Sequence, residues 1–280
     1  MSSLTGTLFH HSHFPPELIA AERECTVSVC VPARDEARTI GPIVESLVRL
    51  RELGAVDEVV VVDASADGTG DIAARLGADV HAQGDLMPGF GEVRGKGDAM
   101  WRALSVLRGD VVCFVDADTE RFGQHFACGL VGPLVVDPSV QFVKGFYRRP
   151  FRLGDAVAPE GGGRVTELTA RPALELFYPE LADIRQPLAG EIAARRELLE
   201  RLPFATGYAV EIAMLIDAFE VAGLDAIAQV DLDERQNRHQ PLSELGPMAL
   251  EVMRAVLSRA GAAEGEVVER PPMASLRAAA

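Results

Sequence analysis

The chain of 280 residues is long enough for one large domain, or two coupled ones, with a sizeable core. Its formal net charge of -15 argues against general binding to nucleic acids or anionic membranes, so we expect neither as a partner. No apolar run reaches the length of a membrane helix, and the first residues lack the basic start and apolar stretch of a signal peptide. The four cysteines show no CxxC spacing, and we expect reduced thiols in a cytoplasmic protein.

Apolar runs and helical patterns alternate along the first half of the chain. Residues 1–24 are predicted to form an irregular or helical lead-in, whose cluster His10-His11-Ser12-His13 is more typical of a mobile end than of a metal site. Strands are predicted at 26–32, 58–62, 78–82 and 111–115, and helices at 39–53, 71–76 and 98–107. This alternation predicts an α/β fold with a doubly wound, mainly parallel sheet.

The second half of the chain is less regular. Strands are predicted at 141–147 and 226–231, and helices at 165–176, 189–202, 209–221 and 245–258. The segment 154–163 is rich in Gly, Pro and Ala and is predicted to be a loop, and the tail after residue 260 is predicted to be loosely held.

Acidic residues follow three of the predicted strands. Asp116 and Asp118 come directly after the buried run 111–115, Asp63 follows 58–62, and Arg34-Asp35-Glu36 follows the first strand. In open α/β sheets, ligands bind beyond the carboxyl ends of the strands. Paired carboxylates there suit Mg²⁺ or Mn²⁺ carrying a diphosphate. The alternative is that these residues only cap turns and helices; three such strand ends together favour a nucleotide site.

The basic residues comprise 25 arginines and only two lysines, Lys96 and Lys144, each beside glycine. A compact ammonium contacts phosphate differently from a guanidinium fork, so both lysines are candidate site residues, or else remnants of composition. The dinucleotide and phosphate-loop glycine patterns do not fit the chain. Lys96 nevertheless precedes a predicted helix, whose first amides could hold diphosphate oxygens together with it.

The segment Gly161-Gly162-Gly163-Arg164-Val165-Thr166 offers a second anion site. Arg164 presents a planar fork and Thr166 a hydroxyl, although the segment could also be a flexible loop with Thr166 as a helix cap. Glu191 and Glu211 lie beside predicted helix starts, which they could merely stabilise. His239 follows the last predicted strand, as a metal ligand or as a solvated loop residue.

Several of these segments resemble known enzymes. The order Pro32-Ala33-Arg34-Asp35-Glu36, Asp63 and Asp116-Ala117-Asp118 resembles GT-A-type glycosyltransferases, whose Asp-x-Asp motif holds a divalent metal on a nucleotide sugar. Over roughly residues 26–260 the chain looks like the glucosyl- and mannosyl-3-phosphoglycerate synthases. The segments that carry this likeness are 95–101, 143–150, 161–168, 186–191 and 207–212.

The resemblance implies a GT-A fold and retaining transfer of a hexose from a nucleotide diphosphate sugar to the 2-hydroxyl of 3-phosphoglycerate. It implies a nucleotide-sugar half, residues 1–150, an acceptor half, residues 151–280, and a homodimer. The donor nucleotide would be held by Pro32, Ala33, Arg34, Glu36, Asp63, Lys96 and Asp116. Asp118 would bind Mg²⁺ or Mn²⁺, Glu211 would lie by the transferred sugar, and the acceptor would be held by Gly163, Arg164 and Thr166. The residues expected to be catalytic are Lys96, Asp116, Asp118, Arg164 and Glu211.

One segment departs from the family pattern, which has a metal-binding histidine in Arg-x-His-Arg. The matching run here is Arg235-Gln236-Asn237-Arg238, so either Asn237 or His239 would complete the metal site. The donor also stays open among GDP-mannose, GDP-glucose and UDP-glucose. Arg34 could stack on a purine, which slightly favours a GDP-sugar.

Two other functions compete with glycosyl transfer. A sugar nucleotidyltransferase would use a similar sheet and metal, but such enzymes carry a glycine-rich loop after the first strand, where this chain has Arg34-Asp35-Glu36-Ala37-Arg38. A non-catalytic module that binds nucleotide sugars would show the same binding residues without turnover.

Overall fold

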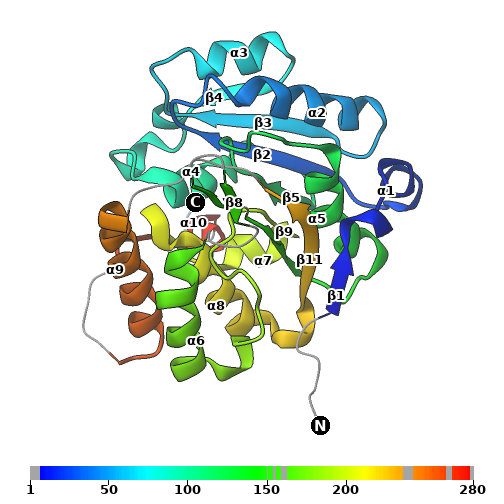
Figure 1. Cartoon of the computed structure of the whole chain (residues 1–280). Helices are drawn as coiled ribbons and strands as arrows, with labels where there is room; N and C mark the ends of the chain where they lie inside the picture. Colours follow the sequence, from blue (N-terminus) through cyan, green and yellow to red (C-terminus); the bar gives the residue numbers. More distant parts are fainter. Residues whose placement is uncertain are drawn as a thin grey trace.

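The computed structural model describes residues 7–149, 151–153, 156–158, 163–235, 242–262 and 267–277. Its centre is an eight-stranded sheet in the order β1-β11-β6-β9-β5-β2-β3-β4 (Figure 1). All neighbours in this sheet are parallel except at β9, which runs antiparallel to both β5 and β6. The strands are β1 Thr7–His10, β2 Val27–Ala33, β3 Glu58–Asp63, β4 Asp79–Ala82, β5 Val111–Phe114, β6 Phe142–Arg148, β9 Ile192–Arg195 and β11 Ile227–Glu234.

Helices cover both faces of this sheet. The helices are α1 Pro16–Glu22, α2 Ile40–Glu52, α3 Thr69–Arg75, α4 Gly95–Ala103, α5 Gln124–Val136, α6 Arg171–Phe177, α7 Arg196–Arg201, α8 Val210–Ala222, α9 Leu242–Arg259 and α10 Met273–Arg277. Two small antiparallel pairs complete the fold, namely β7 Phe151–Leu153 with β8 Ala156–Ala158, and β10 Phe204–Ala205 with β12 Glu269–Arg270.

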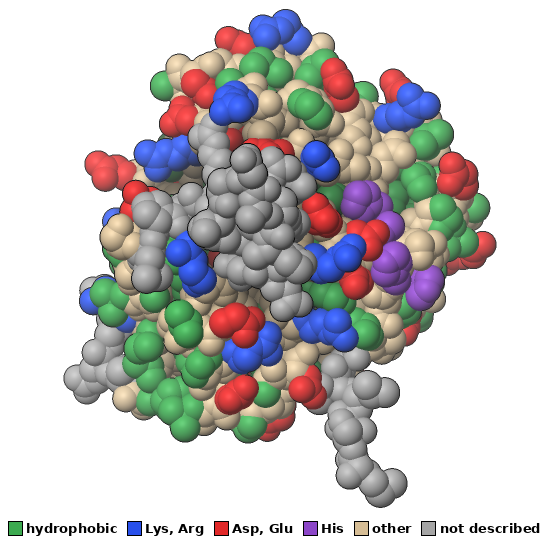
Figure 2. Space-filling model, in the orientation of Figure 1, with side chains coloured by type: hydrophobic (Ala, Val, Ile, Leu, Met, Phe, Trp, Pro, Cys, Tyr) green, Lys and Arg blue, Asp and Glu red, His purple; other side chains and the backbone are tan. Residues whose placement is uncertain are grey.

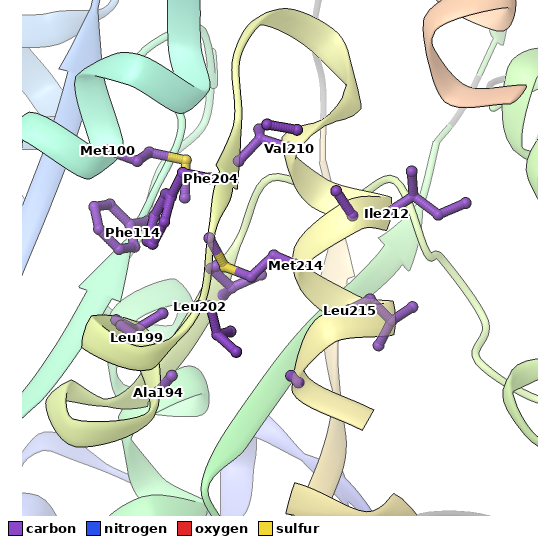
Figure 3. Packing of buried hydrophobic residues seen from close by; sticks show 14 of the residues in the cluster. Met100, Phe114, Ala194, Leu199, Leu202, Phe204, Val210, Ile212, Met214 and Leu215 are labelled. Atoms are coloured by element: carbon purple, nitrogen blue, oxygen red, sulfur yellow. The ribbon is translucent and has the colours of Figure 1, made fainter. Parts of the chain in front are cut away.

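The two faces of the sheet bury separate apolar clusters. On one face α4 and α8 pack against the strands, and Met100, Phe114, Phe204 and Met214 are buried together (Figure 3). On the other face α2 and α5 cover the sheet. Strands that are buried on both faces read as continuous apolar runs, which is why the strand pattern was visible in the sequence.

The predicted fold class is confirmed, since the sheet is mainly parallel with helices on both faces. The predicted strands correspond to β2, β3, β4, β5, β6 and β11, with ends shifted by up to three residues. The sheet takes strands from both 1–150 and 151–280, and the division into donor and acceptor halves stays a prediction about function. Among the described residues, the structure contains no helix that is long and apolar enough to span a membrane.

The helix predicted at 189–202 is wrong, because Ile192–Arg195 forms strand β9 and a helix follows only at Arg196. Alanine favours helices in isolation, but here Ala193 and Ala194 are fully buried between two neighbouring strands, and tertiary packing overrides the local preference. No element was predicted for α5, whose Gly129, Gly132 and Pro133 are typical of turns. At Gly132 a side chain would overlap the ring of Phe14, so this helix depends on close packing with the N-terminal segment.

The N-terminal lead-in also differs from its prediction. His10 ends β1, and His11–His13 form a short 3-10 helix that packs against α5 and β11. The histidine cluster therefore has a defined position in the fold and is not a mobile end. Its side chains are partly buried or exposed, and they face the end of the last strand of the sheet.

Candidate active site

The strand-end acids lie at one edge of the sheet, as expected. Strands β5, β2 and β3 are parallel neighbours, and Ala33 pairs in register with Asp63. Asp116 and Asp118 follow β5 directly. The residue before them is tied to the adjacent strand, because the Val115 amide donates to the Cys30 carbonyl at 3.1 Å. The carboxyl ends of three strands thus meet at the crevice predicted for a nucleotide.

Three groups predicted from separate segments meet at this edge. Nζ of Lys96 donates to Asp116 Oδ1 and, at 2.8 Å, to Glu211 Oε1. Lys96 lies in the first turn of α4, and Glu211 in the first turn of α8. Burial alone would lower the pKa of Lys96, but the two carboxylates outweigh it and raise that pKa, so the ammonium is charged at neutral pH.

Arg235 is the second cation at this edge. It opens the run 235–238, in which only Asn237 was predicted to have a role. Its guanidinium contacts Asp116 Oδ2 at 2.9 Å and also Asp118 Oδ1. Burial opposes the charges, yet Lys96 and Arg235 together hold the pKa of Asp116 well below its ordinary value. Because the chain has 25 arginines, residue type alone does not mark Arg235 as a site residue. Its one sequence signal is its position directly after the last strand.

Arg235 also joins a buried network behind the two aspartates. It lies 2.9 Å from Glu191 Oε1 and donates to the Tyr147 hydroxyl at 2.6 Å. That hydroxyl donates to Glu191 Oε2 at 2.7 Å and accepts from Arg149 at 2.9 Å. Burial raises the pKa of Glu191 despite Arg235, and raises the pKa of Tyr147 to about 12. Glu191 therefore does not start a helix. It directly precedes β9, and its carboxylate holds the Arg235 guanidinium in place.

The other lysine, Lys144, lies beneath the site and is 1% exposed. Its Nζ donates to the Ala189 carbonyl at 2.5 Å. Burial lowers its pKa to about 8, an effect that the nearby Glu211 carboxylate only partly offsets. Both of the rare lysines thus belong to the same region of the molecule, but only Lys96 is placed to reach a ligand at the edge of the sheet.

Two glycines let the chain approach closely here. A side chain at Gly190 would lie 2.5 Å from Oδ2 of Asp116 and closer still to Nζ of Lys96. A side chain at Gly97 would overlap the Ala205 carbonyl, because α4 packs directly on β10. Gly97 is therefore needed because α4 packs directly on β10. Gly190 is needed because the Lys96–Asp116 pair occupies the space that a side chain would take.

The remaining predicted donor residues surround the ends of β2 and β3. Pro32 and Ala33 end β2, Arg34 is exposed, and Glu36 begins the turn that leads to α2. The Glu36 amide donates to Thr69 Oγ1 at 2.9 Å, and Asp63 accepts from the Ser65 amide at 3.1 Å. The first of these bonds joins the loop after β2 to the loop after β3, and the second fixes the loop after β3 on itself.

The predicted acceptor residues begin a different element. Gly163, Arg164 and Thr166 precede or start the helical turn Thr166–Ala170 that continues into α6. Gly163 adopts φ +77°, a conformation that favours glycine, and Thr166 is buried. Asn237 and His239, the candidates to complete a metal site, lie outside the described residues.

The charges at this edge fit a divalent cation. Nη2 of Arg235 contacts one oxygen of Asp116 and one of Asp118, so the two carboxylates already hold a positive group between them. Carboxylate oxygens are the ligands that Mg²⁺ and Mn²⁺ prefer. A divalent cation bound by Asp118 would lie beside carboxylates that already pair with Arg235 and Lys96.

Comparison with known proteins agrees with this geometry. Residues 28–147 match the family described as glycosyl transferase family 2. The glucosyl-3-phosphoglycerate synthase of Mycolicibacterium paratuberculosis is 49% identical over 249 residues, covering 88% of this chain and 75% of the relative. That of Petrotoga mobilis is 45% identical over 258 residues, covering 90% of this chain and 79% of the relative.

Solved structures extend the likeness to the whole fold. The mannosyl-3-phosphoglycerate synthase of Rubrobacter xylanophilus has a TM-score of 0.88 at 44% identity and covers 96% of both chains. The glucosyl-3-phosphoglycerate synthase of Mycobacterium tuberculosis, in complex with Mn²⁺, UDP-glucose and phosphoglyceric acid, has a TM-score of 0.90 at 40% identity, covering 99% of this chain and 100% of the other. The resemblance predicted from the motifs is therefore confirmed, and this chain belongs to the glucosyl-3-phosphoglycerate synthase family of GT-A-type glycosyltransferases.

Proposed function

We propose that this enzyme transfers a glucosyl group from a nucleotide diphosphate sugar to the 2-hydroxyl of 3-phosphoglycerate, with retention of configuration and with Mn²⁺ or Mg²⁺. The observation that carries the proposal is the cluster of Lys96, Asp116, Asp118 and Arg235 at the carboxyl edge of the sheet. Relatives of this chain are glucosyl-3-phosphoglycerate synthases, and one such structure holds both substrates and Mn²⁺.

The donor diphosphate would lie against the cations of this cluster. When the sugar leaves, negative charge develops on the diphosphate, and a fixed ammonium or guanidinium stabilises that charge without reorganisation. Lys96 is fixed in place by Glu211 at 2.8 Å, and Arg235 by Glu191 at 2.9 Å. The bound divalent ion, held by Asp118 together with Asn237 or His239, would supply further charge neutralisation at the same oxygens.

The acceptor and the sugar need their own contacts. We assign the acceptor phosphate and carboxylate to Gly163, Arg164 and Thr166, because a guanidinium fork and a hydroxyl match these anions. We place Glu211, whose Oε1 accepts from Lys96 at 2.8 Å, beside the transferred sugar, as the family likeness implies. Because no carboxylate pair of glycosidase type is assigned here, we favour attack on the same face of the sugar, with the donor phosphate taking the acceptor proton.

A direct assay tests the function and its rivals together. The protein is incubated with 3-phosphoglycerate, Mn²⁺ and, separately, UDP-glucose, GDP-glucose or GDP-mannose, and the sugar product and the released nucleotide are identified. Nucleoside diphosphate with a glucosylated acceptor is the expected outcome, most strongly with UDP-glucose, the donor in the mycobacterial complex. Pyrophosphate release from a nucleoside triphosphate would point instead to a nucleotidyltransferase, and donor binding without turnover to a binding module.

A pair of variants separates metal chemistry from folding. Asp118→Asn should lose most transfer activity, whereas Asp79→Asn, at the exposed start of β4, should keep it. We also propose that the enzyme acts in the cytoplasm as a homodimer. The cysteines support a reducing compartment, since Cys25, Cys30, Cys113 and Cys128 are all unpaired thiols. Light scattering after gel filtration measures the oligomeric state.

A further inference from the structure

A second group of candidate metal ligands lies where the first strand of the sheet meets the last. His10, His11 and Asp233 each offer one ligand atom, and these atoms all lie within 4.8 Å of one another. Nε2 of His11 is 2.7 Å from Oδ2 of Asp233, and Nε2 of His10 is 3.5 Å from Oδ1. Figure 2 shows histidine side chains gathered beside acidic ones on the surface of the molecule.

The fold brings these three residues together from opposite ends of the chain. Strand β1 pairs in parallel with β11, with His10 opposite Asp231. Two residues later the register with β6 shifts, and Asp233 adopts φ +67° while its amide donates to Asp231 Oδ1 at 2.9 Å. This irregular strand end places the Asp233 carboxylate beside both imidazoles.

The donor set is typical of zinc and similar ions. Two imidazole nitrogens and one carboxylate, with water in the fourth position, form a common tetrahedral zinc site. Ligand atoms around such an ion are roughly 3.4 Å apart, given bonds of about 2.0–2.1 Å. The separations of 2.7 and 3.5 Å between these side chains bracket that value.

Neighbouring groups support or compete with this site. Oγ of Ser12 lies 2.8 Å from Nδ1 of His10, where it can accept the proton that a metal-bound imidazole keeps on that nitrogen. Without a metal, the same nitrogen can accept from the Ser12 amide at 3.2 Å instead. The ring of His125 packs against His11 with centroids 4.6 Å apart. The Arg148 guanidinium approaches Asp233 at 3.8 Å, but its side chain is 70% exposed and can turn toward solvent.

We propose that His10, His11 and Asp233 form a second divalent-metal site, suited to Zn²⁺, that joins the end of β1 to the end of β11. Arg235, which contacts Asp116 and Asp118, comes two residues after Asp233. A metal at this point would fix the strand end that delivers Arg235 to the active site. The site is separate from the Asp-x-Asp metal and does not depend on the proposed reaction.

Zinc titration of the full chain tests the site. Zn²⁺ is titrated against a chromophoric chelator in the Asp118→Asn background, which removes the other metal ligand. We expect one tightly bound equivalent of Zn²⁺. Its affinity should fall about 100-fold when His11→Ala or Asp233→Asn is added. His81→Ala is the matched control. His81 also lies near a carboxylate, that of Asp79 at 3.4 Å, but this pair offers only two candidate ligands instead of three. Its zinc affinity should not change.

Thermal melts guard against a variant that merely folds poorly. Zn²⁺ should raise the Tm of the Asp118→Asn protein by several degrees, and this rise should vanish when His11→Gln is added. Cobalt in place of zinc should give the visible absorption of a tetrahedral ion. Absence of a tight equivalent in the Asp118→Asn background, or a zinc affinity that His11→Ala leaves unchanged, would overturn the proposal.

Discussion

The close approach at Gly190 gives a sharp test of the Lys96–Asp116 pair. In Gly190→Ala the new methyl group would lie 2.5 Å from one carboxylate oxygen of Asp116 and closer to the Lys96 ammonium. Because a comfortable contact needs about 3.5 Å, these groups must retreat by about 1 Å. Displacing a catalytic group by that distance costs about 100-fold in rate, or about 2.7 kcal/mol of transition-state stabilisation.

The same substitution should leave the fold largely intact. The atoms that the methyl group meets are the ends of side chains, and Lys96 is 27% exposed, so the strain can be relieved toward solvent. Overpacking of this kind costs about 1 kcal/mol, a fall in Tm of about 2–4 °C for a chain of this size. We therefore expect kcat/KM for glucosyl transfer to fall about 100-fold while the Tm falls by only about 2–4 °C.

Two matched glycine variants bracket this result. Gly89→Ala has no heavy atom within 4 Å of the new methyl group and should behave as wild type in both assays. Gly97→Ala would overlap the backbone carbonyl of Ala205, so it should lower the Tm strongly. A value of kcat/KM for Gly190→Ala within threefold of wild type, or a loss that follows Tm in all three variants, would refute the reasoning.

Three further predictions concern charge. In the native state the pKa of Lys144 is about 8, whereas in the unfolded chain it is about 10.5. The free energy of unfolding in urea should therefore rise between pH 7 and pH 10, by about 2–3 kcal/mol more in wild type than in Lys144→Met. Equal pH dependence of the two proteins would contradict the lowered pKa. Arg270→Ala should cost about 3 kcal/mol in the same assay, because it removes a guanidinium that bonds the fully buried Asp98 and the carbonyls of Phe90 and Glu92. Stability in urea equal to wild type would show that the other cation on Asp98, the Arg102 guanidinium at 2.9 Å, suffices. EDTA should abolish glucosyl transfer and Mn²⁺ should restore it, and transfer that persists without metal would exclude a metal role for Asp118.

The sequence predicted most of the sheet because its strands are buried on both faces. Unbroken runs such as 58–62 and 111–115 leave little choice of structure, and the acids that follow them necessarily meet at one edge. The pairing of Lys96 with Glu211 joins residues 115 positions apart, and no spacing rule predicts it. The family likeness assigned Lys96 to the donor nucleotide and Glu211 to the transferred sugar, but it did not predict that the two side chains touch.

The missed residues have a common cause. Glu191 was assigned to a helix because the following Ile192-Ala193-Ala194 run lacks a period that separates helix from strand. Tyr147 carries no local signal, and Arg235 only its position directly after a strand, since their role depends on the side-by-side placement of β6 and β11. Interactions between distant strand ends become visible only once the strand order is known.

The reversed direction of β9 has a consequence for how this catalytic surface can change. Every parallel neighbour arrives at the crevice with its last residues, whereas β9 departs from it with its first, so Gly190 and Glu191 stand at the beginning of a strand. The turn ahead of them is tied to β6, because Nε2 of Gln186 donates to the Tyr147 carbonyl and Nζ of Lys144 donates to the Ala189 carbonyl. A substitution in the stretch 186–191 would therefore disturb β6 and the Lys96–Asp116 pair together.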